Sequence, residues 1–438
     1  MTTPEHRRLA RRDFLRLAAL GGAGAAVAGP FGLAACSSGQ PGTVLDPEVD
    51  GDDPGAPATP GSASGSGDGQ VATADTDRRV LVMIQLDGGN DGLDTLVPYG
   101  DGRYHDARPT IGVDPSTVLA LDDTYGWNPN LARLHDRGLA GVAGLGTPSP
   151  DLSHFESMRR WWEGDPTGTE RVATGFLGRL CDRLDAGAPV TGVSIDLGPS
   201  PALRSEASVT LSVPDEGNRW WLDSDDPWMV ALRDGLRAFG TGGADAPPLL
   251  GAARSNIATA FDFVDALGTL GDRSEDYPWT DIGGRLELAS RLLRADTGVR
   301  VIHVPYSGFD THDDHRWTHD NLLAGLDEAL DVFLADLDGR GLADRTLVAT
   351  YSEFGRRVPE NAGGTDHGAA SVALLAGPVT AGRYGEYPSL GDLDDEDDLK
   401  ASIMLDTYYA TLAEEWFGIP ADDVLATKAA PLTGLLRT

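Results

Sequence analysis

Cysteine and lysine are nearly absent from this chain of 438 residues. Its two cysteines, Cys36 and Cys181, exclude a framework of several disulfides, so packing must hold the fold together. Only Lys400 and Lys428 are lysines among 35 basic residues, which face 68 acidic ones and leave a net charge of −33. Nucleic acids and anionic membranes bind cationic surfaces, so this charge excludes a general binder of either kind. A small anionic substrate would need a local site.

The N-terminus has the layout of a targeting segment over residues 1–35, with a basic start, a weakly apolar middle and small residues at its end. Arg11 and Arg12 form a twin-arginine pattern, which predicts export by the twin-arginine translocation machinery. The sequence Leu-Ala-Ala-Cys ending at Cys36 resembles a lipobox. We expect cleavage there and lipidation of Cys36. The alternative, a transmembrane anchor, is disfavoured because the segment is lean in Leu, Ile and Phe.

This address predicts a protein in the cell envelope, attached to the outer face of the cytoplasmic membrane through the lipid anchor only. Residues 36–78 are acidic and rich in Gly, Pro, Ser and Thr, with almost no large apolar residue, which predicts a disordered linker. The globular part is then expected over residues 79–438. Within it, residues of about 204–276 have a mixed pattern and are interpreted as a cap or insertion.

The body alternates apolar runs of strand length with helical patterns, which predicts an α/β fold with helices on the faces of a sheet. Runs that are apolar on both faces suit buried central strands. We predict such strands at 80–86, 139–145, 190–195, 299–305, 347–351 and 371–375. Helical periodicity is clearest at 282–295, 321–337 and 402–416, with a further helix-like stretch at 256–270.

Carboxylates interleaved with glycines follow the first predicted strand, in the sequence Leu-Asp-Gly-Gly-Asn-Asp-Gly-Leu-Asp. Open α/β sheets bind ligands at strand ends, so Asp87, Asp91 and Asp94 are candidate metal ligands. Carboxylates this crowded repel one another unless a cation is present. The alternative is an acidic turn in which Asp91 and Asp94 act as turn or cap groups.

Ser153 begins the sequence Ser-His-Phe-Glu, which is expected to open a helix. One interpretation is a capping box, with Ser153 as N-cap and Glu156 reaching back to it. The other is a nucleophile, because the free N–H groups and the dipole at a helix N-terminus favour an anion such as a phosphate or sulfate ester. The sequence leaves both open.

Histidines and carboxylates also gather after the later predicted strands. Asp310 and His312 lie in a dense cluster, where an exposed polar loop would equally explain His315 and His319. Three further candidate ligands follow. Arg356, which lies between them in the sequence, is suited to hold an anionic oxygen. Mixed carboxylate and imidazole groups suit a transition metal more than Ca²⁺ and favour one shared site. These further ligands are Glu353, Asp366 and His367.

Several of these motifs together resemble DUF1501, a bacterial family of unknown function placed in the alkaline phosphatase and sulfatase superfamily. They are the Asp-Gly-Gly-Asn-Asp-Gly-Leu-Asp turn, Ser-His-Phe-Glu at 153–156, Thr-Gly-Phe-Leu-Gly-Arg at 174–179, Asp-Thr-His at 310–312, Ser-Glu-Phe-Gly-Arg at 352–356 and Gly-Thr-Asp-His-Gly at 364–368. The resemblance spans residues 79–438. It implies an alkaline phosphatase-like three-layer α/β sandwich with a large, mostly parallel sheet and metals at the strand ends.

Carried over by position, the resemblance implies metal ligation by Asp87, with Asp91 and Asp94 as rivals. It implies later ligands at Asp310, His312, Glu353, Asp366 and His367, and a nucleophile near Ser153. The implied cofactor is a divalent metal, Zn²⁺ or else Mn²⁺ or Mg²⁺. The predicted function is metal-dependent hydrolysis of a phosphate or sulfate ester. The alternative is a non-catalytic binding or assembly protein of the cell surface with the same fold.

Overall fold

The computed structural model of this protein describes residues 78–169, 171–184, 188–214, 224–242, 246–270 and 273–437. The predicted signal peptide with Arg11 and Arg12, the lipidation site Cys36 and the linker up to residue 77 lie outside these residues. Among the residues described, no helix is both long and apolar enough to cross a membrane. Cys181 is buried and forms no disulfide within the described residues.

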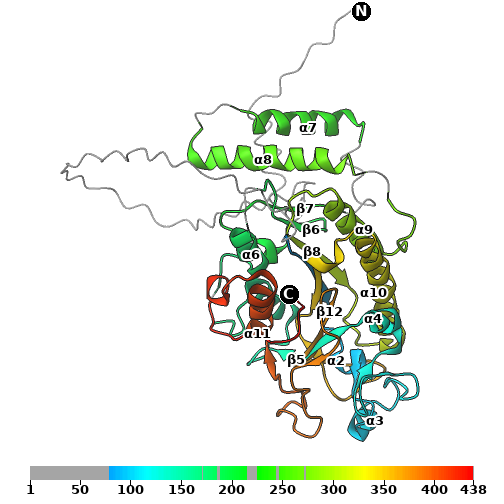
Figure 1. Cartoon of the computed structure of the whole chain (residues 1–438). Coiled ribbons are helices and arrows are strands. Elements are labelled where there is room, and N and C mark those ends of the chain that lie inside the picture. The colour runs from blue at the N-terminus through cyan, green and yellow to red at the C-terminus, as the bar shows by residue number, and fades with distance from the viewer. Residues whose placement is uncertain are drawn as a thin grey trace, which may run out of the picture.

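A nine-stranded sheet forms the centre of the molecule (Figure 1). Its strands lie in the order β13-β5-β12-β9-β1-β8-β6-β7, and β14 also pairs with β5. Only β12 runs antiparallel to its neighbours β5 and β9. The strands are β1 Val80–Asp87, β5 Ala140–Gly146, β6 Gly192–Ser194, β7 Thr210–Ser212, β8 Val301–Ser307, β9 Thr346–Tyr351, β12 Ser371–Ala376, β13 Gly382–Tyr384 and β14 Ile403–Met404. All six predicted strands are strands of this sheet.

The helices alternate with these strands along the chain. They are α2 Gly92–Thr95, α3 Gly102–Ala107, α4 Ala132–Arg137, α5 His154–Glu163, α6 Phe176–Leu184, α7 Pro227–Gly240, α8 Pro248–Leu267, α9 Asp281–Arg294, α10 His315–Asp338 and α11 Leu405–Ala410. A π-helical stretch, Thr411–Trp416, continues α11. The predicted helices are found, although α10 begins six residues before the predicted start.

Two hydrophobic cores, one on each face of the sheet, produce the three layers. Successive side chains of a strand point to opposite faces, and β1 shows this alternation. Val82 and Ile84 belong to a core shared with α9 and α10, whereas Leu81 and Met83 belong to a core shared with α6 and α11. Figure 1 shows these helix pairs on opposite sides of the sheet. The predicted three-layer α/β fold with a large, mostly parallel sheet is confirmed.

The region interpreted as a cap or insertion contains β7 and the helix pair α7 and α8. The two helices pack together at one end of the molecule, beyond β7 (Figure 1). Helix α8 contributes Ala260, Phe263 and Leu267 to the core that includes α9 and α10, whereas α7 buries no residue. The region is therefore attached to the body through β7, a strand of the central sheet, and the helix pair is attached through α8.

Two small sheets complete the fold. One joins β2 Leu96–Val97, β4 Gly126–Trp127 and β3 Leu119–Ala120. The other pairs β10 Gly355–Arg356 with β11 His367–Gly368, antiparallel, and sets Arg356 opposite His367. This short ladder brings two predicted site residues, eleven positions apart in sequence, to the same edge of the central sheet.

Candidate metal centre

The carboxyl ends of three neighbouring parallel strands, β9, β1 and β8, bring predicted site residues together. Asp87 is the last residue of β1, Glu353 follows β9 by two residues, and Asp310 follows β8 by three. All three side chains line one cavity of about 440 Å³. This position, outside the carboxyl ends of central strands, is where open α/β sheets bind their ligands.

Three histidines converge on Asp310 within this edge of the sheet. The Nε2 atom of His312 lies 3.1 Å from Oδ1 of Asp310, and that of His367 lies 3.2 Å from the same oxygen. The Nε2 atom of His154 lies 3.5 Å from Oδ2 of Asp310. The Nε2 atoms of His312 and His367 are themselves 3.0 Å apart. Three imidazole nitrogens, all potential ligand atoms, therefore meet around one carboxylate.

An oxygen atom faces the Nδ1 atom of each of these rings. For His367 this is the backbone carbonyl oxygen of Leu152, at 2.8 Å. For His154 it is Oε1 of Glu353 at 3.0 Å, and for His312 it is Oδ1 of Asp366 at 3.4 Å. A carbonyl or carboxylate oxygen only accepts, so this arrangement assigns the proton of a neutral ring to Nδ1. The Nε2 lone pairs are then left facing Asp310.

Burial, hydrogen bonds and nearby charges shift the pKa values of the cluster residues in different directions. Burial lowers the pKa of His367, which favours its neutral form. The hydrogen bond with Glu353 raises the pKa of His154. Burial alone would raise the pKa of Asp310, but the hydrogen bond and positive charge of Arg356 lower it overall. Asp310 is therefore an ionised carboxylate whose oxygens are shared between a guanidinium and the imidazoles.

Arg356 has a different role from the one predicted for it. Its side chain is fully enclosed and donates to Oδ1 of Asp310 at 2.7 Å and to the carbonyl oxygens of Gly89 and Phe309, each at 2.9 Å. A further donor reaches the carbonyl of Thr365 at 3.0 Å. Because these contacts occupy each of its three nitrogens, the expectation that it holds a substrate oxygen is corrected: Arg356 positions Asp310 and the loops around it.

Ser153 lies between two residues that contact the cluster. It occupies the N-cap position of α5 with extended backbone, but its side chain makes no cap hydrogen bond. Glu156 instead pairs with Arg159, at an Oε2 to Nε distance of 2.9 Å. The predicted capping box is therefore not formed. Ser153 is exposed, and the residues on either side of it, Leu152 and His154, both contact the cluster.

Asp87 shares the cavity but is not one of the groups that meet at Asp310. Ser307 donates to its Oδ2 at 3.1 Å, and the side-chain amide of Gln85 donates to its Oδ1. Burial raises the pKa of Asp87 to about 6; the charge of Glu353 adds to this and the hydrogen bonds oppose it. A carboxylate this costly to ionise beside another carboxylate is one that a nearby cation would stabilise.

Asp91 and Asp94 lie elsewhere, in a buried cluster around Arg108. The guanidinium donates to Oδ2 of Asp91 and to Oδ1 of Asp94, each at 2.7 Å, and Asp91 also caps α2. His315 lies 3.1 Å from Asp94 in the same cluster, although the sequence suggested an exposed loop for His315 and His319. Both histidines are buried in α10. Arg108 already supplies the positive charge here, so the structure does not bring Asp91 into a site shared with Asp310.

His154 is the residue of the cluster that sequence reasoning missed. It lies inside the Ser-His-Phe-Glu motif, in which the sequence predicts a role only for Ser153, as N-cap or nucleophile, and for Glu156, as its partner in the capping box. The only signal was a histidine at the start of a helix that follows a buried strand. Its contact with Glu353, 199 positions away, could not be read from spacing.

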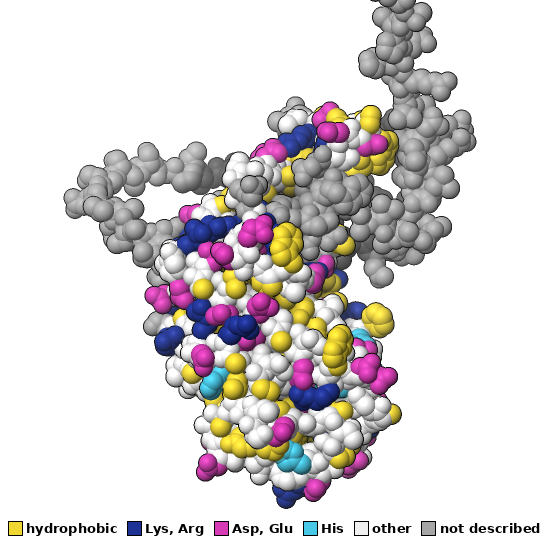
Figure 2. Space-filling view, turned by 90° about the vertical axis from the view of Figure 1, so that its right-hand side faces the viewer, with side chains coloured by type: hydrophobic (Ala, Val, Ile, Leu, Met, Phe, Trp, Pro, Cys, Tyr) yellow, Lys and Arg dark blue, Asp and Glu magenta, His cyan; other side chains and the backbone are white. Residues whose placement is uncertain are grey.

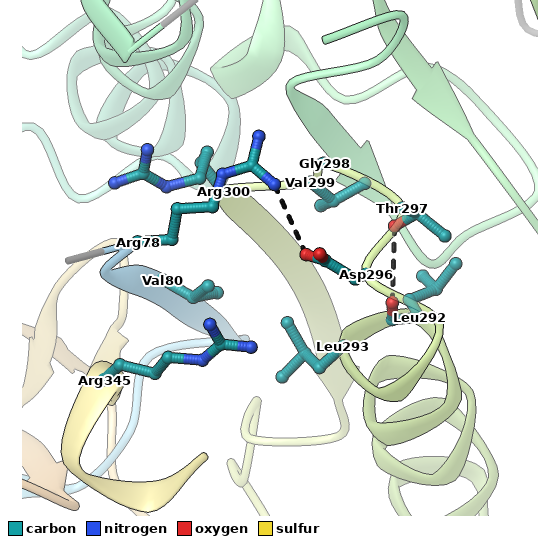
Figure 3. Close-up of a pocket in the computed structure, with 10 residues that line it drawn as sticks. All are labelled: Arg78, Val80, Leu292, Leu293, Asp296, Thr297, Gly298, Val299, Arg300 and Arg345. Atoms are coloured by element: carbon teal, nitrogen blue, oxygen red, sulfur yellow. Dashed lines mark hydrogen bonds and ion pairs between the residues drawn. The ribbon is translucent and has the colours of Figure 1, made fainter. Parts of the chain in front are cut away.

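A second pocket lies at the opposite, amino end of β1 (Figure 3). Its lining includes the ion pair of Arg78 with Asp296, at 3.3 Å, and Thr297, which donates to the carbonyl of Leu292. Its volume of about 10 Å³ holds about one water molecule. It cannot accommodate an organic substrate, whereas the cavity beside Asp310 can.

Residues 255–415 match the DUF1501 family, described as proteins of unknown function. The resemblance noted in the sequence is thereby confirmed for that segment. The DUF1501 segment contains Asp310, His312, Glu353, Asp366 and His367, whereas Asp87, Ser153 and His154 precede it. A comparison with curated protein sequences finds no match.

Solved structures similar to this chain include a protein in the alkaline phosphatase superfamily from Vibrio parahaemolyticus. It is 12% identical with a TM-score of 0.35, covering 71% of this chain and 63% of its own length. A phosphonate monoester hydrolase from Silicibacter pomeroyi is 11% identical with a TM-score of 0.35, covering 78% and 73%. A periplasmic domain from Escherichia coli, solved with Zn, is 12% identical with a TM-score of 0.33, covering 78% and 83%. These scores are too low to carry an argument, so the fold rests on the sheet and layers described above.

The donor set around Asp310 suits a transition metal. Histidine nitrogens and one carboxylate are ligands that Zn²⁺ prefers, whereas Mg²⁺ and Ca²⁺ prefer oxygen alone. Ligand atoms around a tetrahedral ion with bonds of 2.0–2.1 Å lie about 3.3 Å apart. Asp310 lies 3.1 to 3.5 Å from each of the three histidines, and His312 lies 3.0 Å from His367, close to this value. His154, Asp310 and His367 each offer a ligand atom within 4.8 Å of the other two. The residues present therefore fit the predicted cofactor.

Proposed function

We propose that this chain is a metal-dependent hydrolase of phosphate or sulfate esters. Asp310, His312 and His367 would hold the ion, with His154 as a further donor and Zn²⁺ as the favoured metal. The observation that supports this most strongly is the orientation of the three imidazoles, each with Nδ1 facing an oxygen and Nε2 facing Asp310. Such partners behind the ligands fix the tautomer and raise the basicity of metal-binding histidines.

When bound, a divalent cation would neutralise the anionic ester and favour ionisation of a nearby hydroxyl. The other roles belong to the chain itself. Ser153 supplies the hydroxyl, its oxygen forming a bond to phosphorus or sulfur while the ester bond breaks and the alcohol leaves with the proton. Water then releases phosphate or sulfate and restores Ser153. Arg356 keeps Asp310 in place, and Glu353 orients His154.

Export and membrane attachment are further parts of the proposal, supported by the twin-arginine pattern at Arg11 and Arg12 and the lipobox before Cys36. A protein anchored only through Cys36 would be released from the membrane fraction by Cys36→Ser. Fractionation of cells expressing that variant tests this point. An unchanged membrane association in Cys36→Ser would contradict the lipid anchor.

The nucleophile is tested with Ser153→Ala, assayed with zinc-loaded protein on a panel of phosphate and sulfate esters. We expect the rate on any accepted ester to fall by about 100-fold or more, because the attacking oxygen is removed. The exposed turn residue Ser116 offers a matched control, and Ser116→Ala should leave the rate unchanged. Zinc content is measured in parallel and should be the same in all three proteins.

Two other outcomes have distinct meanings. Hydrolysis that survives Ser153→Ala would contradict the nucleophile and leave the metal centre in place. Zinc binding without hydrolysis of any ester would favour the second candidate function, a non-catalytic binding or assembly protein. One observation favours that candidate: the Ser153 hydroxyl makes no hydrogen bond with the described residues that would orient it for attack.

A further inference from the structure

The cavity beside Asp310 has two chemically different kinds of lining. Carboxylates and His154 form one, and Phe155, Met158 and Trp162 form the other. These three apolar residues are spaced i, i+3 and i+7 along α5, so they share one face of that helix. The helix that begins with His154 therefore carries one histidine of the polar cluster as well as the apolar wall.

Phe155 is the unusual member of this wall, because 90% of its surface is exposed. A ligand that covers a large apolar side chain removes it from water, which favours binding. Met158, by contrast, is buried and forms the base of the wall. Among the lining residues, Phe155 is thus the one with most surface left for a ligand.

The indole of Trp162 is held in place by the same amide that reaches Asp87. Its Nε1 donates to Oε1 of Gln85 at 2.7 Å, and Gln85 donates in turn to Asp87. Gln85 is buried and also accepts a hydrogen bond from Tyr351. Trp162 is therefore fixed relative to Asp87 before any ligand binds.

We infer that the face formed by Phe155, Met158 and Trp162 is a binding subsite for the alcohol part of the ester, and that it selects an apolar, ring-bearing group. This inference rests on the proposed function, because the alcohol part of the ester lies against α5 only if the anionic part binds at the metal. A ring stacked on Phe155 and Trp162 removes apolar surface of both partners from water. A methyl ester offers too little surface to do so.

The test compares the binding of phenylphosphonate and methylphosphonate to zinc-loaded protein by calorimetry. The two probes share the anionic group and differ in the ring. We expect phenylphosphonate to bind about tenfold more tightly or better, on the scale of burying a ring. Phe155→Ala should remove most of this preference and leave methylphosphonate affinity unchanged. Trp317→Ala, which changes another exposed aromatic residue on α10, should alter neither affinity.

Equal affinities of the two phosphonates in the wild type, or a preference that Phe155→Ala leaves intact, would overturn the subsite. If neither phosphonate binds, the proposed function fails, and benzyl alcohol decides the subsite separately. Saturation-transfer NMR that detects benzyl alcohol on the wild type but not on Phe155→Ala would support it, and no transfer to either would overturn it. Self-association lost in Phe155→Ala, measured by sedimentation, would instead make this face an interface between copies.

Discussion

Burial lowers the pKa of several histidines of this protein, and His303 shows the largest effect with a defined value. Its ring lies inside the sheet, with Nδ1 3.1 Å from Oγ of Ser194 and Nε2 3.1 Å from the hydroxyl of Tyr351. Burial, with a smaller contribution from the charge of Arg285, lowers the pKa of His303 to about 3. An unfolded chain has a histidine pKa of about 6.5. Between these values the unfolded state binds a proton that the folded state does not.

His303 should therefore make the protein less stable in acid. Its contribution is constant above pH 6.5, and the free energy of unfolding falls as the pH drops from 6.5 towards 3, by at most about 1.4 kcal/mol per pH unit. His303→Gln removes this titration, so the variant should lose less stability than the wild type over pH 4.5 to 6.5. Urea unfolding in the presence of a chelator measures it, with His135→Gln as control. Equal pH slopes in His303→Gln and wild type would refute this assignment.

Among the structural elements, the turn after β1 lies very close to the turn after β8, and this contact positions the site. Gly88, which follows β1, has a φ of +120°, and a Cβ atom added to it would collide with the backbone of Asp310. Its backbone N–H also donates to Oε1 of Glu353 at 2.8 Å. The loops after β1, β8 and β9 thus meet at a residue that can only be glycine.

Gly88→Ala is expected to lower the free energy of unfolding by about 1–3 kcal/mol, from backbone strain and from displacement of the Asp310 loop. It should also weaken zinc binding. Gly284→Ala provides a control of opposite sign, because Gly284 lies in α9 with open space around it. That variant should be more stable by about 0.5–1 kcal/mol. Thermal unfolding compares them; a Gly88→Ala protein as stable as wild type would contradict the close approach.

The elements were predictable where burial alone decides them. The run Val-Leu-Val-Met-Ile-Gln-Leu is apolar on both faces and forms β1, buried on both faces. Polar residues held by distant partners were not predictable. Asp91 and His315 look like loop ligands in sequence, but the cation that pairs with Asp91 is Arg108, 17 positions further on. The proton position on His367 likewise depends on the carbonyl of Leu152, 215 positions away.

The charge of the whole molecule sets the conditions for its function. The net charge is −33, and Figure 2 shows acidic and basic side chains interspersed over the face that carries α9 and α10. Such a surface repels an anionic ester at long range, and salt screens this repulsion. The cavity itself adds Asp87, Asp310 and Glu353. An anionic substrate therefore requires a bound cation in the cavity, which makes metal binding the central claim.

The amount of zinc that the globular part of the protein retains tests this claim most directly. The wild type, the double variant Asp310→Ala/His367→Ala and the control His135→Ala are loaded with zinc, dialysed against metal-free buffer and analysed by plasma mass spectrometry. We predict at least one zinc ion per chain in the wild type and in His135→Ala, and none in the double variant, because it loses two of the converging ligands. A wild type that retains no zinc, or a double variant that retains as much as the wild type, would contradict the account.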